Sequence, residues 1–174
     1  ILYRTQLTGP KEKAPLTIQE VRDRALVFVD RKFQGVIDRF ENNTIDIEVP
    51  SEGAQLDILV ENMGRINYGP KLHDRKGITE GVRINYQFQY GWEIYCLPMD
   101  NLDGLTYETG NSPVTDSPSF YRGSFEAEEI GDTFVELPGW KKGIVVVNGF
   151  NIGRYWEIGP QETLYLPGPL LKKG

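Results

Sequence analysis

The sequence is poor in the residues that build most metal and redox sites. Its 174 residues include one cysteine, Cys96, and one histidine, His73. A single cysteine excludes a disulfide within the chain, and a zinc site would depend on carboxylates, for which no suitable cluster is apparent. Cys96 lies in an apolar run and is expected to be a buried, inert thiol, whereas His73 lies in a polar loop. We expect no metal or cofactor; a structural calcium would suit an all-β protein, but the sequence carries no signature for one.

Long hydrophobic runs and clusters of basic residues are also missing. No apolar run approaches the ~20 residues that span a bilayer, and the first residues lack the plan of a signal peptide, resembling a strand of something longer. The net charge is −6, and the longest basic blocks are the pairs Lys141-Lys142 and Lys172-Lys173. The sequence therefore predicts no membrane and no nucleic-acid partner. The compartment stays open: the single cysteine indicates only that no disulfide is needed, and a cytoplasmic, bacterial-type protein fits best.

Strand periodicity dominates what is present. Thr44–Val49 alternates apolar with acidic residues, and Val82–Tyr90 alternates over nine positions; Leu26–Val29 and Leu56–Val60 are shorter strand runs. With 19 glycines and 11 prolines between such runs, the pattern predicts an all-β protein of antiparallel β-sandwiches. Helical signal is weak: Thr17–Arg24 offers a capping box and one turn at most, and it also fits a strand entering the core.

A weak internal echo suggests two domains. Val27–Gly35 and Val145–Gly153 share one plan, a hydrophobic strand, an Asp or Asn turn and a returning strand that reaches a glycine. Asn148-Gly149 is a strong hairpin signal because both residues tolerate positive φ. We predict a first small sandwich over residues 1–90 and a second over 91–174, with a polar connecting loop at 101–119.

No pair of catalytic carboxylates can be assigned. Glu61 ends an apolar strand, as catalytic acids do in β/α barrels, but the strands here are too closely spaced for barrel helices. Glu61 is therefore expected to pair with a nearby arginine or to cap a turn. Glu126, Glu128 and Glu129 are expected to form a solvated acidic patch. We predict no catalytic residue in this chain.

Aromatic and polar residues suited to sugars gather late in the chain. Aromatic faces bind the apolar side of a pyranose, and amide or guanidinium groups bind its hydroxyls. The same aromatics equally suit a core or a contact with a neighbouring domain, so both roles stay open for the candidate residues Trp92, Trp140, Asn148, Arg154, Tyr155 and Trp156.

An ordered series of segments resembles the β-galactosidases of glycoside hydrolase family 35. The segments are Ile1–Thr5, Asp23–Asp30, Leu59–Gly69, Lys76–Ile78, Trp92–Leu97, Phe120–Phe125, Asp132–Phe134 and Trp140–Gly168. Two departures stand out. Val146 occupies a position where tryptophan is frequent in that family, and Lys172-Lys173-Gly174 stands where relatives continue into a closing strand.

The resemblance implies two galactose-binding-domain-like jelly rolls. In that family both catalytic glutamates lie on a β/α barrel, a fold of ~250 residues that no segment of this chain resembles. The implied role is therefore non-catalytic: the chain supports the catalytic barrel of the same polypeptide. That polypeptide is implied to be a retaining enzyme that hydrolyses terminal β-galactosides. The chain would also help the enzyme to assemble, including as a possible homo-oligomer. The alternative is an autonomous carbohydrate-binding module for galactose-containing glycans.

Overall fold

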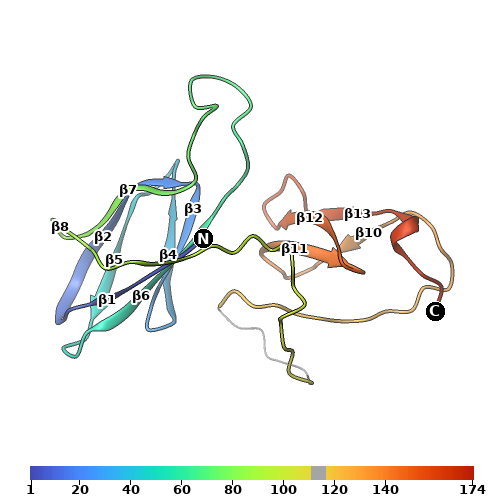
Figure 1. Cartoon of the computed structure of the whole chain (residues 1–174), viewed down its shortest axis with the longest axis horizontal. Helices are drawn as coiled ribbons and strands as arrows, with labels where there is room; N and C mark the ends of the chain where they lie inside the picture. The colour runs from blue at the N-terminus through green and yellow to red at the C-terminus, as the bar shows by residue number, and fades with distance from the viewer. Residues whose placement is uncertain (111–116) are drawn as a thin grey trace. The chain divides into compact units, whose positions relative to one another are not determined.

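The computed structural model describes residues 1–110 and 117–174 and divides into two compact units (Figure 1). The first unit is Ile1–Phe120 and the second is Tyr121–Gly174. This division lies later in the chain than the predicted boundary at residue 90, because strand β9 (Glu93–Tyr95) pairs with β1 (Leu2–Leu7) in the first unit. Residues 111–116 of the predicted loop lie outside the described residues, and its described residues form no strand.

The first unit is a sandwich of two antiparallel sheets. One sheet has the order β4-β3-β6-β1-β9 and the other the order β5-β2-β7-β8. The remaining strands are β2 (Lys11–Arg22), β3 (Arg24–Val29), β4 (Lys32–Asp38), β5 (Thr44–Val49), β6 (Ala54–Glu61), β7 (Gly77–Ile84) and β8 (Gln87–Phe88). The all-β, antiparallel sandwich class predicted from the sequence is thereby confirmed.

A single apolar core fills the space between these sheets. Alternate residues of each strand supply it, as the period of two requires; its fully buried members include Leu16, Ile18, Val27, Ile37, Ile47, Leu56, Ile58, Val82 and Ile84. In β5 the predicted alternation holds, since Ile47 and Val49 are buried while Asp46 and Glu48 are exposed. Burial of these large side chains is the main driving force for the fold.

Two elements predicted from the sequence differ in the structure because the backbone changes direction locally. The possible helical turn over Thr17–Arg24 falls in strand β2, where a register irregularity follows Gln19 and Glu20 takes a φ of 57°. That β-bulge shifts the core residues from Ile18 to Val21, a spacing that imitates a helix. The nine-residue strand over Val82–Tyr90 is likewise wrong: Asn85, with a φ of 55°, starts a hairpin turn, and only Ile84 and the residues before it reach the core.

The second unit contains two antiparallel strand pairs. β10 (Thr133–Glu136) pairs with β13 (Thr163–Leu166), β11 (Lys142–Val147) pairs with β12 (Phe150–Trp156), and a 3-10 turn follows at Gly168–Leu170. Among its described residues only Tyr155, Leu164 and Leu166 are buried hydrophobic side chains. Asp132 fastens the last turn to β13, accepting hydrogen bonds from the Gly168 N–H at 2.8 Å and the Tyr165 hydroxyl at 2.7 Å.

The sequence pattern shared by Val27–Gly35 and Val145–Gly153 corresponds to two β-hairpins with the same type of turn. The central turn residues have positive φ in both, Asp30 and Arg31 in the first and Asn148 and Gly149 in the second. Such a pair is the mark of a type I′ turn, whose twist matches the strands it joins. Three residues after each turn the register shifts, opposite Val27/Phe28 and opposite Val145/Val146. The hairpin predicted at Asn148-Gly149 is confirmed.

The first of these turns predicts a stabilising substitution. Arg31 has a φ of 65°. In this left-handed region the Cβ of a non-glycine residue destabilises the folded state by about 1–2 kcal/mol, whereas glycine loses only conformational entropy worth roughly 0.5–1 kcal/mol. We expect Arg31→Gly to raise the free energy of unfolding by about 0.5 kcal/mol in urea denaturation. Lys32→Gly, one residue later in strand β4, should lower it by about 0.5–1 kcal/mol. Equal losses from both substitutions would contradict the turn assignment.

Candidate functional site

The outer face of the five-stranded sheet carries an apolar row that crosses every strand. Cross-strand register aligns Val36 with Leu26, Leu26 with Leu59, Leu59 with Leu2, and Leu2 with Tyr95. Each lies opposite in parity to core residues such as Ala25 and Ile58, and each is half-buried or exposed. An antiparallel sheet with one free face normally alternates apolar with polar residues. A row without a polar member is therefore typical of a face that meets another surface.

The neighbouring row on this face combines aromatic and paired charged residues. Phe28 and Phe33 pack with ring centroids 5.6 Å apart. Beside them Asp57, only 6% exposed, accepts from Arg4 Nε at 2.7 Å and from Gln55 Nε2 at 2.7 Å. The carboxylate is thus held between two donors, and its charge is compensated where it is buried.

A buried ion cluster lies at the end of the same sheet, around Asp23. Arg39 Nη1 bridges Asp23 at 2.6 Å and Asp74 at 2.7 Å, and Lys76 Nζ reaches Asp23 at 2.8 Å. The Met63 N–H donates to the same carboxylate at 2.8 Å. The side chains of Asp23 and Arg39 are each 5% exposed, so these charges interact out of bulk water.

The backbone joins the cluster to the sheet. The Asp23 N–H donates to the Glu61 carbonyl and the Arg39 N–H donates to the Asp23 carbonyl, both at 3.0 Å. Burial alone would raise the pKa of Asp23, but hydrogen bonds from Lys76, the Met63 N–H and Arg39 outweigh burial and hold that pKa below its ordinary value. At Asp74 burial again acts to raise the pKa, but the hydrogen bond from Arg39 and the nearby charges of Arg39, Arg22 and Lys76 together lower it. Both carboxylates are therefore ionised ligands for the surrounding cations.

This cluster fixes the long loop that joins β6 to β7, residues 62–76, which leaves the sheets as an extended excursion (Figure 1). Loops of this length without secondary structure are uncommon and usually functional. Asn62 caps its first turn by accepting from the Gly64 N–H at 2.9 Å. Farther along, Tyr68 is 88% exposed. The loop is fastened at both ends and presents an aromatic ring between them.

Trp92, the one predicted sugar-contact residue in the first unit, is a packing residue. Its ring lies edge-on to Tyr3, with centroids 6.4 Å apart, and packs against the core. Its indole N–H donates to the Gln89 carbonyl at 2.9 Å. The group that would bind a sugar hydroxyl is therefore already used within the chain.

The five predicted residues of the second unit lie on or beside one hairpin but do not face the same way. Tyr155 is 5% exposed and burial raises its pKa, while Trp156 and Arg154 point to the opposite side of β12. Lys142 Nζ lies 3.5 Å from the centroid of the Trp156 ring and so occupies one of its faces. Trp140 packs edge-on against Tyr121 at 4.7 Å.

Asn148, in the hairpin turn, uses its side chain within the second unit. Its amide Nδ2 donates to the Leu170 carbonyl at 2.8 Å. The structure thus brings Trp156 and Arg154 to one face, places Tyr155 on the other, and ties Asn148 to the last turn. A sugar contact by these residues stays a prediction.

The remaining sequence candidates are placed as follows. Cys96 is exposed, so the expectation of a buried thiol is wrong; β9 ends at Tyr95, and Cys96 lies beyond the sheet. His73 is exposed, as predicted, and so is the acidic patch Glu126, Glu128 and Glu129. Glu61 stands directly opposite Arg24 across the β3–β6 pair.

Over the described ranges, 1–110 and 117–174, no three acidic, histidine or cysteine side chains group to hold a metal, and no helix is long and apolar enough to cross a membrane.

Two domain families match this chain, one in each part of it. The first all-β domain of β-galactosidases matches residues 1–98, and their galactose-binding domain matches residues 118–174. The chain belongs to the β-galactosidase family. It matches two non-catalytic domains of that family, and the family resemblance stated from the sequence is confirmed.

Three relatives show how much of a β-galactosidase this chain spans. It is 40% identical to the β-galactosidase of Xanthomonas manihotis, with 95% of this chain and 28% of that protein aligned. For β-galactosidase 17 of Arabidopsis thaliana the values are 37%, 100% and 29%, and for the human β-galactosidase 39%, 98% and 28%. The chain thus spans less than a third of these relatives.

Sequence reasoning missed the apolar row and the ion cluster. The signal for the row was present: Ala25-Leu26-Val27-Phe28-Val29 is an unbroken apolar run, and such a run predicts a strand covered on both faces. The ion cluster had no comparable signal. Asp23, Arg39 and the pair Asp74 and Lys76 come from three separate parts of the sequence, and they meet only when the residues beside β3 and β4 assemble with the loop 62–76.

The ion cluster predicts an acid-sensitive first unit. A carboxylate with a lowered pKa stabilises the fold above its unfolded pKa of about 4 and loses that contribution as pH falls through the folded value. Asp23→Asn should lower the free energy of unfolding by about 3 kcal/mol at pH 7, because Lys76 and Arg39 lose a buried counter-charge. The mutant should also show a weaker decline in stability below about pH 4 than the wild type.

Urea denaturation at both pH values measures these effects. Asp46→Asn is the matched control, since Asp46 is half exposed and 3.8 Å from Lys13, and it should cost less than about 1 kcal/mol. An Asp23→Asn loss no larger than that of the control would show that the cluster contributes little.

Proposed function

We propose that this chain is a supporting part of a longer β-galactosidase polypeptide and docks onto its catalytic part through the outer face of the five-stranded sheet. The observation that carries this proposal is the apolar row of Val36, Leu26, Leu59, Leu2 and Tyr95. Hydrolysis of terminal β-galactosides is then the activity of the whole polypeptide. The chain contributes rigidity and a docking surface.

The flanking groups suit a docking role. On one side of the apolar row, the register aligns Asp38, Arg24 and Glu61; on the other lie Arg4, Asp57 and Glu93. An apolar centre with charged residues of both signs at its rim is the usual anatomy of a protein interface. The loop 62–76, fastened by the Asp23 cluster, extends the same end of the sheet with an exposed tyrosine.

A hybrid enzyme tests the proposal directly. The chain replaces the aligned region of the Xanthomonas manihotis β-galactosidase, of which it spans 28%. We expect the hybrid to hydrolyse a chromogenic β-galactoside, and we expect the 174-residue chain alone to give only the background rate. Turnover by the isolated chain would refute the supporting role.

A charge placed in the apolar row should weaken the hybrid selectively. Leu59→Glu puts a carboxylate into the buried centre of the proposed interface and should cost about 2 kcal/mol or more of docking energy, measured as a lower thermal inactivation temperature of the hybrid. Gln87→Glu adds the same charge at an exposed position of the other sheet and should leave that temperature within about 1 °C of the parent.

Two results would exclude this interface. One is an equal effect of both substitutions on the hybrid. The other is a stable dimer of the isolated chain that Leu59→Glu dissociates, because a second copy would then be the occupant of the face. Sedimentation of the chain at about 10 μM, well above the dissociation constant of a specific dimer, separates the two occupants.

A further inference from the structure

The turn of the β11–β12 hairpin contains the only Asn-Gly step in the sequence, Asn148-Gly149. Both residues are exposed. Gly149 has a φ of 83°, and a Cβ built on it would meet no heavy atom within 4 Å beyond its chain neighbours. Open space therefore surrounds the peptide bond that joins the two residues. Because glycine has no side chain, its backbone nitrogen is also the least hindered nucleophile that can follow an asparagine.

An Asn-Gly step in this position can lose ammonia without an enzyme or a cofactor. The Gly149 backbone nitrogen gives up its proton and bonds to the Cγ carbon of Asn148, while the bond from Cγ to Nδ2 breaks. The amide nitrogen leaves with that proton as ammonia, and a five-membered succinimide ring remains. Water then opens the ring at one of its two carbonyls and gives an aspartyl or an isoaspartyl residue. The sum is the hydrolysis of one amide, with no oxidation or reduction.

In the folded chain this side-chain amide is already engaged. Asn148 Nδ2 donates to the carbonyl oxygen of Leu170, 22 positions later, at 2.8 Å. Leu170 ends the 3-10 turn Gly168–Leu170, whose hydrogen bonds run from the Leu170 N–H to Pro167 at 3.0 Å and from the Leu171 N–H to Gly168 at 2.9 Å. The contact holds the amide of Asn148 in one rotamer, so it is not free to rotate onto the Gly149 nitrogen.

The docking of this last turn depends on Asp132. Its carboxylate accepts from the Gly168 N–H at 2.8 Å and from the Tyr165 hydroxyl at 2.7 Å. Gly168 is buried, and a Cβ on it would lie 3.1 Å from the carbonyl carbon of Gly131. The turn is therefore seated closely, but by few hydrogen bonds and in a unit with little buried apolar surface. Such a segment opens more readily than a strand of a large core.

We propose that Asn148 is a deamidation site whose reaction is gated by the last turn, Gly168–Leu170. The amide reacts while its contact with Leu170 is open. The product carries a carboxylate, ionised at neutral pH, so an acceptor replaces the Nδ2 donor opposite the Leu170 carbonyl and the contact does not form again. An isoaspartyl product also adds a backbone atom to a two-residue turn, which the type I′ hairpin does not accommodate. Deamidation thus fixes the last turn in its undocked state.

Peptide mapping of the 174-residue chain tests the site. The chain is incubated in a mildly alkaline buffer, which favours loss of the Gly149 amide proton, and the mass of each asparagine peptide is followed with time. We expect the Asn148 peptide to convert to the acid, in both the aspartyl and the isoaspartyl form. Asn101 is the internal control: it is also exposed, but the side chain of Leu102 hinders the same attack, so its peptide should stay unchanged.

A variant of the last turn tests the gate. Asp132→Ala removes the acceptor of the Gly168 N–H and should raise the rate of conversion at Asn148 about tenfold, the effect of losing one hydrogen bond to a charged group. Glu136→Ala removes an exposed carboxylate at the other end of strand β10 and should leave that rate unchanged. Unchanged amide exchange in β11 shows that the hairpin of the Asp132→Ala variant is intact.

A product mimic tests the consequence for the last turn. Asn148→Asp should raise hydrogen exchange at the Leu170 and Leu171 amides about tenfold, because the turn loses its contact with the hairpin. Asn151→Asp is the matched control. It adds the same charge to the same hairpin, but the Asn151 side chain is an acceptor, from the Gly153 N–H at 2.9 Å, and a carboxylate keeps that role. Exchange at Leu170 and Leu171 should then stay as in the parent.

Three outcomes overturn the proposal. One is conversion at Asn148 no faster than at Asn101. The second is an equal rate at Asn148 in the parent and in Asp132→Ala, and the third is equal exchange of the last turn in the two aspartate variants. None of these results bears on the docking proposal, because docking is measured in the hybrid enzyme through Leu59.

Discussion

The buried carboxylate of Asp23 is the constraint on which the position of the loop 62–76 in the first unit depends. It lies between β2 and β3 and accepts hydrogen bonds from Arg39 in the segment after β4, from Lys76 at the end of the loop 62–76 and from the Met63 N–H at the start of that loop. One side chain therefore joins both sheets and the long connection between β6 and β7. An aspartate placed here is stable only because every part of its charge is compensated. The loop 62–76 consequently has a defined position although it contains no regular secondary structure.

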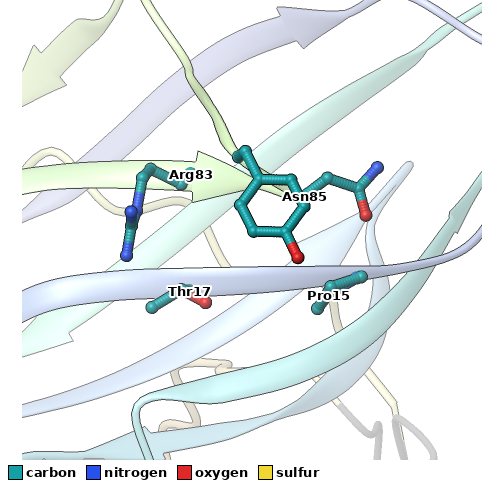
Figure 2. Close-up of a pocket in the computed structure, with 5 residues that line it drawn as sticks. Pro15, Thr17, Arg83 and Asn85 are labelled. Carbon is teal, nitrogen blue, oxygen red and sulfur yellow. The ribbon is translucent and has the colours of Figure 1, made fainter.

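The two sheets of the first unit share one core but present different surfaces. The five-stranded sheet turns apolar side chains outward along a full row, which suits a large, dry contact with protein. The four-stranded sheet turns outward polar residues such as Thr17 and Arg83 (Figure 2), which alternate with the buried Leu16 and Ile84. The sandwich geometry makes this division possible, since alternate residues of each strand serve the core and leave the other face free to vary.

The second unit uses the same hairpin design with a different outcome. Both hairpins combine a type I′ turn with a register shift three residues later, and in both a glycine with positive φ, Gly35 or Gly153, stands at the shift. In the first unit the hairpin adds an edge to a five-stranded sheet. In the second it remains a pair, and large side chains such as Phe134, Phe150 and Ile158 stay more than half exposed. Two of the aromatic residues that suggested a sugar site make local contacts instead: Trp92 packs against Tyr3, and the Trp156 ring lies against Lys142 Nζ.

The sequence by itself determined the all-β class, the hairpin at Asn148-Gly149 and the family, because these depend on local periodicity, turn chemistry and ordered motifs. It failed where a bulge or a turn broke the period, at Glu20 and Asn85, and where a short edge strand left Cys96 outside the sheet. Only the tertiary structure decided the Asp23 cluster and the apolar row. Each of these joins residues from strands far apart in the chain, and cross-strand register, which brings them together, is a property of the assembled sheets.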